Sequence, residues 1–225
     1  MRYGIWIIFI FLSVAELSAQ SFFNATRGRD AIVSFGSGLT SYFGDLNDPG
    51  DIIDAQFNAN IGLQYMFDNR FAARAEFAWF QLQGDDADSD DIGRIKRNLS
   101  FSSNNYEFNI VGLVNAFEYG PRFYQRPEFN IYGFAGVGGL YFNPKAELNG
   151  KKYALQPLQT EGVDYSRFAV VLIYGAGIKY MINPFLNLAF EAGYRLTFTD
   201  YLDDVSTVYR DNASFSDPIA AQLAD

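Results

Sequence analysis

Apolar and polar side chains alternate with a period of two through most of this chain. In residues 186–198, for example, Leu186, Leu188 and Phe190 alternate with Asn187 and Glu191. Successive side chains of a β-strand point to opposite faces, so the pattern predicts strands with one apolar and one polar or small-residue face. Seven segments are predicted to be strands: residues 31–43, 56–67, 70–83, 106–117, 129–142, 168–180 and 186–198. The segments 106–117 and 129–142 are apolar on both faces in places, so the orientation of these two stays open.

The lengths of these segments suit a membrane. Each reaches the ~9–11 residues that a tilted strand needs to cross a bilayer. Their apolar faces carry Phe, Tyr and Leu, and their other faces carry Gly with isolated Arg, Glu, Lys and Asn. Such a mixture suits a narrow lumen of about eight strands that side chains fill. A soluble barrel with the apolar face inside remains an alternative, because the sequence alone does not say which face points inward.

The predicted connections alternate in length along the chain. Those at 68–69, 120–128 and 183–184 are short, and those at 45–54, 84–105, 143–167 and from residue 200 onward are longer. Outer-membrane barrels have short periplasmic turns and longer extracellular loops. The fold class that we predict is therefore all-β, a small transmembrane antiparallel up-and-down β-barrel.

Two further expectations concern the ends of the chain. Residues 1–20 read as a signal peptide, with Arg2, an apolar run over residues 5–14, and Ala19 before the cleavage site. A short N-terminal anchor is the alternative. Residues 21–225 then form the outer-membrane β-barrel domain. Single-chain barrels of this kind have an even number of strands from ~8 upward, so an eighth, closing strand is expected to be missing and the domain to be C-terminally incomplete.

Composition and charge argue against several classes of function. The net charge of −9 disfavours nucleic-acid binding, which depends on Lys and Arg at phosphates. The chain has no Cys and no His, which removes disulfides, His-dependent catalysis and the commonest transition-metal ligands. We expect no catalytic residue, no cofactor and no metal site, and hence not an enzyme.

Three other features invite functional interpretations. Asp86, Asp88 and Asp90 match the first ligand positions of a calcium-binding loop, but Asp91 and Arg97 stand where that loop needs Gly and Glu, which favours a solvated acidic loop over residues 85–91. Four glycines lie inside a predicted strand, which favours relief of crowding at a bend over a nucleotide loop; they are Gly133, Gly136, Gly138 and Gly139. Five charged residues are expected in the lumen, where a paired, space-filling network is favoured over an ion or proton path; they are Arg74, Glu76, Lys179, Glu191 and Arg195.

Several segments resemble the PorG-type outer-membrane barrels of the type IX secretion system. The segments that carry the resemblance are residues 41–47 (SYFGDLN), 97–101 (RNLSF), 154–158 (ALQPL), 160–162 (TEG), 175–180 (GAGIKY) and 191–206 (EAGYRLTFTDYLDDVS). The last of these is long enough to be specific.

The resemblance implies a non-enzymatic role in protein secretion and gliding motility. The chain would be exported through the Sec pathway, sit in outer-membrane lipid, and anchor or assemble a periplasmic ring of PorK- and PorN-type proteins. The residues that we expect to contact this ring are Arg122, Phe123, Tyr124 and Arg126, because they occupy the largest of the short connections and are of types enriched at interfaces. An aromatic girdle at the membrane surface is an equal interpretation of these residues. A generic small barrel with an adhesion or membrane-stabilising role is the alternative function.

Overall fold

The computed structural model describes residues 31–41, 55–85, 100–120, 125–148, 150–161, 163–199, 201–202, 204, 215 and 218–223. The predicted signal peptide (1–20), the acidic residues 86–91 and residues 122–124 lie outside this described part.

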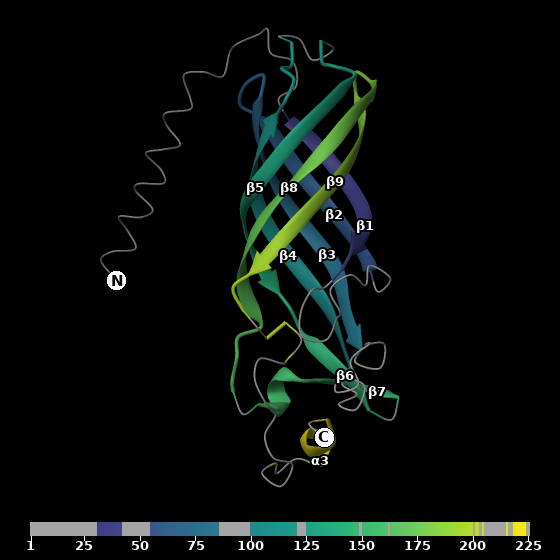
Figure 1. Cartoon of the computed structure of the whole chain (residues 1–225), viewed down its shortest axis with the longest axis vertical. Coiled ribbons are helices and arrows are strands. Elements are labelled where there is room, and N and C mark those ends of the chain that lie inside the picture. The colour runs from purple at the N-terminus through teal and green to yellow at the C-terminus, as the bar shows by residue number, and fades with distance from the viewer. Residues whose placement is uncertain are drawn as a thin grey trace, which may run out of the picture.

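Seven long antiparallel strands form one curled sheet, a half-barrel in which each strand pairs with the next long strand along the chain (Figure 1). The predicted fold class is confirmed, and each of the seven predicted segments is a strand. Their bounds are β1 (Ala31–Thr40), β2 (Gln56–Met66), β3 (Phe71–Asp85), β4 (Ser100–Asn115), β5 (Phe129–Tyr141), β8 (Phe168–Asn183) and β9 (Leu186–Thr197). In the described part of the chain, no helix is both long and apolar enough to cross a membrane.

The strands β1 and β9 are the two edges of this sheet. Within the described residues each of them pairs with one neighbour, β2 or β8, and they do not pair with each other. The expected closing strand lies outside what these residues test, so it stays a prediction.

The apolar face of the sheet points outward and the polar face inward. Phe35 is 79% exposed and Phe168 is 62% exposed, whereas Asn105 and Glu107 are fully buried. This orientation is the reverse of a soluble barrel and is what a lipid-facing barrel requires. It also settles the open orientations: Tyr106, Phe108 and Ile110 of β4 face out, as do Phe129 and Ile131 of β5.

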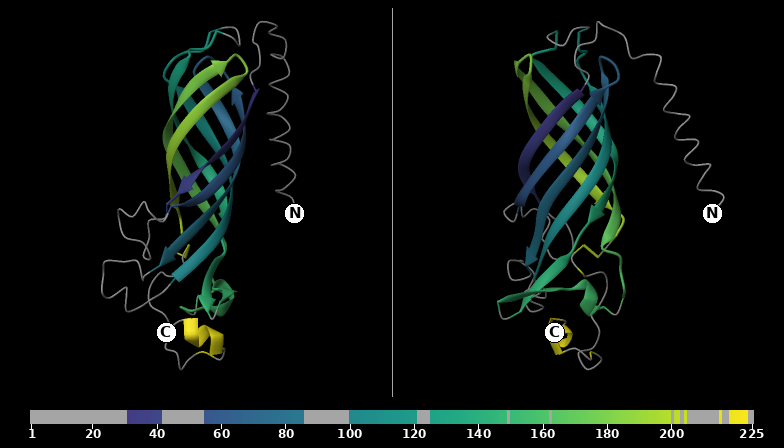
Figure 2. Two further views of the ribbon diagram at one scale, coloured as in Figure 1. Left: turned by 90° about the vertical axis from the view of Figure 1, so that its right-hand side faces the viewer. Right: turned by 180° about the vertical axis from the view of Figure 1, so that it is seen from behind.

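The turns between β2 and β3 and between β8 and β9 lie at one end of the sheet, and the segment that follows β5 lies at the other, as Figure 1 and Figure 2 show. We call the second of these the long-connection end, because the connections predicted to be longer leave the strands there. At the long-connection end, the segment expected to be a loop at 143–167 contains further structure. It forms a hairpin of β6 (Pro144–Leu148) and β7 (Lys151–Ala154), followed by the 3-10 helix η2 (Gln156–Leu158). The short helix α3 (Pro218–Leu223) lies at the same end (Figure 1).

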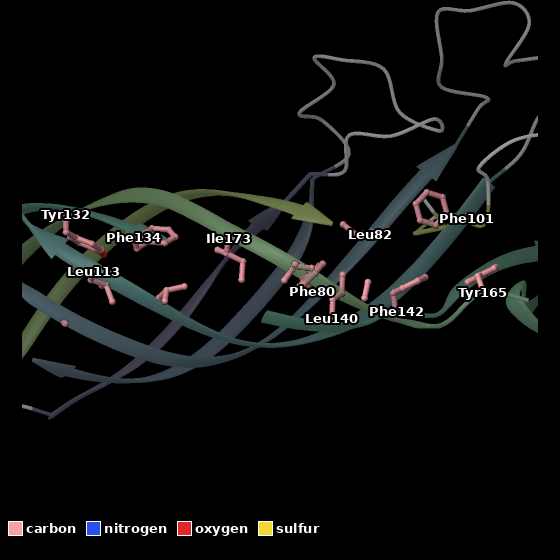
Figure 3. Close-up of a cluster of buried hydrophobic side chains, with 14 of the residues drawn as sticks. Phe80, Leu82, Phe101, Leu113, Tyr132, Phe134, Leu140, Phe142, Tyr165 and Ile173 are labelled. Atoms are coloured by element: carbon pink, nitrogen blue, oxygen red, sulfur yellow. The ribbon is translucent and has the colours of Figure 1, made fainter. Parts of the chain in front are cut away.

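An apolar cluster runs along the interior and continues to the long-connection end (Figure 3). At that end it is built from residues of the barrel strands and from residues beyond them; they include Phe80, Leu82, Phe101, Leu140, Phe142, Leu155 and Tyr165. The interior is therefore packed with side chains, as the predicted narrow lumen requires.

Candidate functional site

The interior holds a network of ion pairs centred on Arg74 of β3. Its Nη1 lies 2.5 Å from Oε1 of Glu191 on β9, and its Nη2 lies 2.8 Å from Oε2 of the same carboxylate. Tyr132 of β5 donates its hydroxyl to Oε1 of Glu191 at 2.6 Å. The Nε of Arg74 is 3.3 Å from Oε2 of Glu76, but it forms no directed hydrogen bond there, so this second contact is electrostatic.

A second ion pair joins Arg195 of β9 to Glu107 of β4. The Nε of Arg195 lies 2.9 Å from Oε2 of Glu107, and the Nδ2 of Asn109 donates to the other carboxylate oxygen at 2.8 Å. Glu107 is fully buried and was not predicted from the sequence. The signal that could have found it is the run Asn105, Glu107, Asn109, which alternates with aromatic residues of β4.

Lys179 completes the set of buried charges. Its Nζ lies 3.4 Å from the hydroxyl of Tyr119 and 4.7 Å from the ring centroid of Tyr132. In the described interior, Arg74 and Arg195 are thus paired with the carboxylates of Glu76, Glu191 and Glu107, whereas no ion pair joins Lys179 to a carboxylate of a described residue.

Pairing of this kind is the condition under which buried charges are tolerated. The predicted pairing is confirmed for Arg74, Glu76 and Glu191, and Arg195 has the unpredicted partner Glu107. The residues that the structure describes contain no group of carboxylates arranged to hold a metal ion.

The three short connections are joined to one another at the opposite end from β6 and β7. The backbone N–H of Tyr119 donates to the carbonyl of Asn69 at 2.9 Å, and Arg70 forms an ion pair with Glu118 at 2.9 Å. Arg126 donates from Nη2 to the carbonyl oxygen of Pro184. We call the surface formed by Asn69, Arg70, Glu118, Tyr119, Arg126 and Pro184 the short-turn rim.

Of the four residues predicted to contact a partner, only Arg126 lies in the described part. It is half-buried, and its guanidinium is used within the protein to tie the connection at 120–128 to the turn between β8 and β9. Exposed aromatic residues surround this end of the barrel; they are Phe67, Phe71, Phe117, Phe129 and Phe185. An aromatic girdle is thus present here, as in other outer-membrane barrels, while Phe123 and Tyr124 lie outside the described residues.

A buried carboxylate lies at the long-connection end. Thr160 donates its hydroxyl to Oδ2 of Asp204 at 2.5 Å, and the hydroxyl of Tyr165 donates to Oδ1. The ring of Tyr165 stacks on Tyr201 at 4.7 Å and on Phe142 at 6.3 Å between centroids. We call Phe142, Thr160, Tyr165, Tyr201 and Asp204 the loop-end cluster.

Burial raises the pKa of Asp204 to about 6, although the two hydroxyl donors oppose that rise. Asp204 also has a left-handed backbone, with a φ of 71°. The loop-end cluster was not predicted from the sequence, because Thr160 and Asp204 are 44 residues apart. Both nevertheless lie in segments that carry the resemblance described above.

The sequence model of one family, described as outer membrane protein beta-barrel domain, matches residues 7–216. Comparison with curated proteins and with solved structures finds no match. The match spans all seven long strands, and the outward apolar face with an inward polar face agrees with it. The chain therefore belongs to the outer membrane protein beta-barrel domain family and is an outer-membrane protein.

Proposed function

We propose that this protein is a non-enzymatic component of the type IX secretion machinery, which anchors or assembles a periplasmic ring of PorK- and PorN-type proteins at the outer membrane. The segments that resemble PorG-type barrels supply the identity of the machinery. The single structural observation that favours an anchoring role is the short-turn rim.

The rim lies at the end of the barrel that faces the periplasm in proteins of this architecture. Its connections are held together by the Tyr119–Asn69 backbone hydrogen bond, the Arg70–Glu118 ion pair and the Arg126–Pro184 hydrogen bond. A surface that is ordered before binding loses less conformational entropy when a partner docks. Three turns that are hydrogen-bonded to one another therefore suit a permanent docking surface better than three turns that move independently.

A non-enzymatic role agrees with the chemistry of the interior. The carboxylates Glu107 and Glu191 are each held by an arginine, which leaves neither free to act as a general base. The absence of His removes the side chain most often used for proton transfer near neutral pH.

The test is to replace Arg122, Phe123, Tyr124 and Arg126 together with Ser and Ala and to measure how much PorK- and PorN-type protein co-purifies from detergent-solubilised envelopes. We expect capture to fall while the barrel still folds. A matched control carries Lys151→Ala on the β6–β7 hairpin, at the opposite end of the molecule. Undiminished capture by the quadruple variant would assign those residues to the girdle and reject them as the docking surface.

A generic small barrel that acts through its external end is the second candidate. The observation that favours it is the ordered structure beyond the membrane strands, namely the β6–β7 hairpin and the loop-end cluster. A clean gene deletion separates the two functions. Type IX cargo should be retained inside the deletion strain if the protein serves secretion, and it should be secreted normally if the protein acts only in adhesion or membrane stabilisation.

A further inference from the structure

The outward face of the sheet changes from apolar to polar near the long-connection end. Trp79, Tyr106, Tyr141 and Phe168 lie side by side on β3, β4, β5 and β8, since each is the register partner of the next. One step beyond this aromatic row, Gln81 donates its side-chain amide to Asn104 at 3.0 Å. The row therefore marks the outer limit of the lipid-facing band, where aromatic girdles occur.

Three cationic side chains follow this row on the polar side. The register of β5 against β4 continues unbroken into β6, so that Lys145 pairs with Ser102 and shares the outward face with Tyr141. Lys152 of β7 reaches back to the same serine, with its Nζ 3.3 Å from Oγ of Ser102. The guanidinium of Arg167 lies 6.0 Å from the ring centroid of Tyr141.

Asn143 connects these residues into one track along the surface. Its side-chain oxygen lies 3.5 Å from Nη1 of Arg167, and it precedes Lys145 by two residues, which places both on one face. We call Lys145, Lys152 and Arg167 the outer cationic track.

The positive charges of the track form no ion pair within the part of the chain that the structure describes. No ion pair joins Lys145, Lys152 or Arg167 to a carboxylate of a described residue. Glu147 is the strand partner of Lys152, yet the amine of Lys152 turns to Ser102. The contrast with the other end of the barrel is clear, because there Arg70 is paired with Glu118.

We propose that the outer cationic track binds the phosphate groups of lipids in the outer leaflet of the outer membrane. Lipid phosphates lie just outside the hydrocarbon region, which is where the track lies relative to the aromatic row. Unpaired cations next to a membrane surface attract anionic headgroups. The protein as a whole carries a net charge of −9, so three unneutralised cations at this level are not a reflection of its composition.

The test uses the full chain, purified in a non-ionic detergent, and native mass spectrometry with diphosphoryl lipid A and with the same lipid after removal of its phosphates. We expect the wild-type protein to retain the phosphorylated lipid at least about tenfold better, because each cation near an anionic surface adds to the attraction. The variant K145A/K152A/R167A should lose this preference. Equal retention of the two lipids by the wild-type protein, or an unchanged preference in the variant, would overturn the proposal.

Lys151 supplies a matched control, since it is the neighbour of Lys152 but lies on the other face of the hairpin, against the ring of Tyr153. Lys152→Ala should weaken retention of the phosphorylated lipid, and Lys151→Ala should not. Equal losses would reduce the effect to non-specific attraction and contradict the proposal. This pair also serves if the triple variant fails to fold. Release of the lipid by millimolar inorganic phosphate from wild-type protein would assign the track to free phosphate and likewise contradict a lipid site.

Discussion

Arg74 and Glu191, which are 117 residues apart in sequence, form a bidentate ion pair across the barrel interior, at 2.5 Å and 2.8 Å. The pair joins β3 to the edge strand β9, with which β3 shares no backbone register. Only 8% of the Arg74 side chain is exposed, so its charge depends on Glu191 and Glu76 for compensation.

We expect Arg74→Ala to lower the free energy of unfolding by about 3–5 kcal/mol, the usual cost of breaking a buried ion pair by removing one partner. The reason is that two carboxylates, Glu76 and Glu191, would then lie in the interior without the guanidinium that pairs with both of them. Urea unfolding of the protein in lipid vesicles, followed by tyrosine and tryptophan fluorescence, measures the change.

Arg70→Ala is the matched control for this prediction. Arg70 lies next to the start of β3 and also forms an ion pair, with Glu118. The side chains of both residues are at least half exposed. An exposed pair contributes about 1 kcal/mol or less. Equal effects of the two substitutions would mean that burial does not govern the strength of the Arg74 network.

Gly136 is expected not to tolerate a side chain. A Cβ at this position would lie 2.6 Å from the Cα of Val111 and would also meet the carbonyl oxygen of Ile110, both in the backbone of β4. Gly136→Ala should therefore destabilise the protein by about 1–3 kcal/mol through overpacking. The folded fraction after refolding in detergent, read from gel mobility without boiling, provides the measurement.

Gly133 on the same strand offers the comparison. A Cβ there would have its nearest neighbour at 3.8 Å, so Gly133→Ala should leave the folded fraction unchanged. The predicted relief of crowding is thus confirmed at Gly136 and also at Gly138, where a Cβ would lie 2.8 Å from the carbonyl oxygen of Phe108. At Gly133 the structure shows no such crowding. A folded fraction that falls equally in both variants would point to loss of backbone flexibility rather than to a close approach of strands.

The strands could be predicted because alternation is a local property of the sequence. In β2 and β9 the outward and inward residues differ so clearly in polarity that the period alone identifies them. The hairpin of β6 and β7 was missed, because strands of five and four residues are too short to show a period. The strand β6 also pairs with Ser102 and Ser103 of β4. This long-range pairing stabilises the hairpin and cannot be predicted from the local sequence pattern.

The interior contacts were only partly predictable for a related reason. The alternation of side chains along each strand predicts that Arg74, Glu76 and Glu191 point into the lumen. Which of these charges form ion pairs depends on the curvature of the whole sheet. The partner of Arg195, Glu107, lies 88 residues away on β4, and no local feature connects the two. The loop-end cluster depends on the same kind of long-range approach, since Thr160 and Asp204 belong to separate connections.

The full protein is expected to fractionate with the outer membrane and to show heat-modifiable mobility in detergent gels. Six antiparallel pairings join the seven strands, with one register shift between Met181 and Asn183 of β8. Such a hydrogen-bonded wall is expected to resist unfolding by detergent until the sample is boiled. Electrophoresis of boiled and unboiled envelope fractions makes the measurement. Recovery in the soluble periplasm, with one mobility before and after boiling, would contradict a membrane-spanning barrel.

The loop-end cluster is expected to open more easily as the pH rises. The pKa of Asp204 is about 6 in the folded protein and 3.8 for an ordinary aspartate. Between these values the folded state holds a proton that the opened state has released, so stability is gained as the pH falls through 6 and lost as it rises through 6. This difference in the pKa of Asp204 corresponds to a loss of up to about 3 kcal/mol in the free energy of opening.

Replacement of Asp204 by Asn removes the titrating group while the side chain keeps an oxygen that accepts from Thr160 or Tyr165. We therefore expect Asp204→Asn to make the free energy of opening independent of pH, and to stabilise the cluster at about pH 8 relative to the wild-type protein. Hydrogen exchange at the backbone amide of Leu155, converted to opening free energies at about pH 5 and pH 8, measures both effects. Leu155 is suited to this because it is buried in the apolar cluster and its N–H donates a hydrogen bond to the carbonyl of Pro144 at 3.0 Å.

Asp164→Asn serves as the control. Asp164 is exposed, and its one side-chain contact in the described part is a hydrogen bond that it accepts from the side chain of Gln156. A pH dependence that survives in Asp204→Asn, or disappears in Asp164→Asn, would show that a group other than Asp204 titrates with the opening of the cluster.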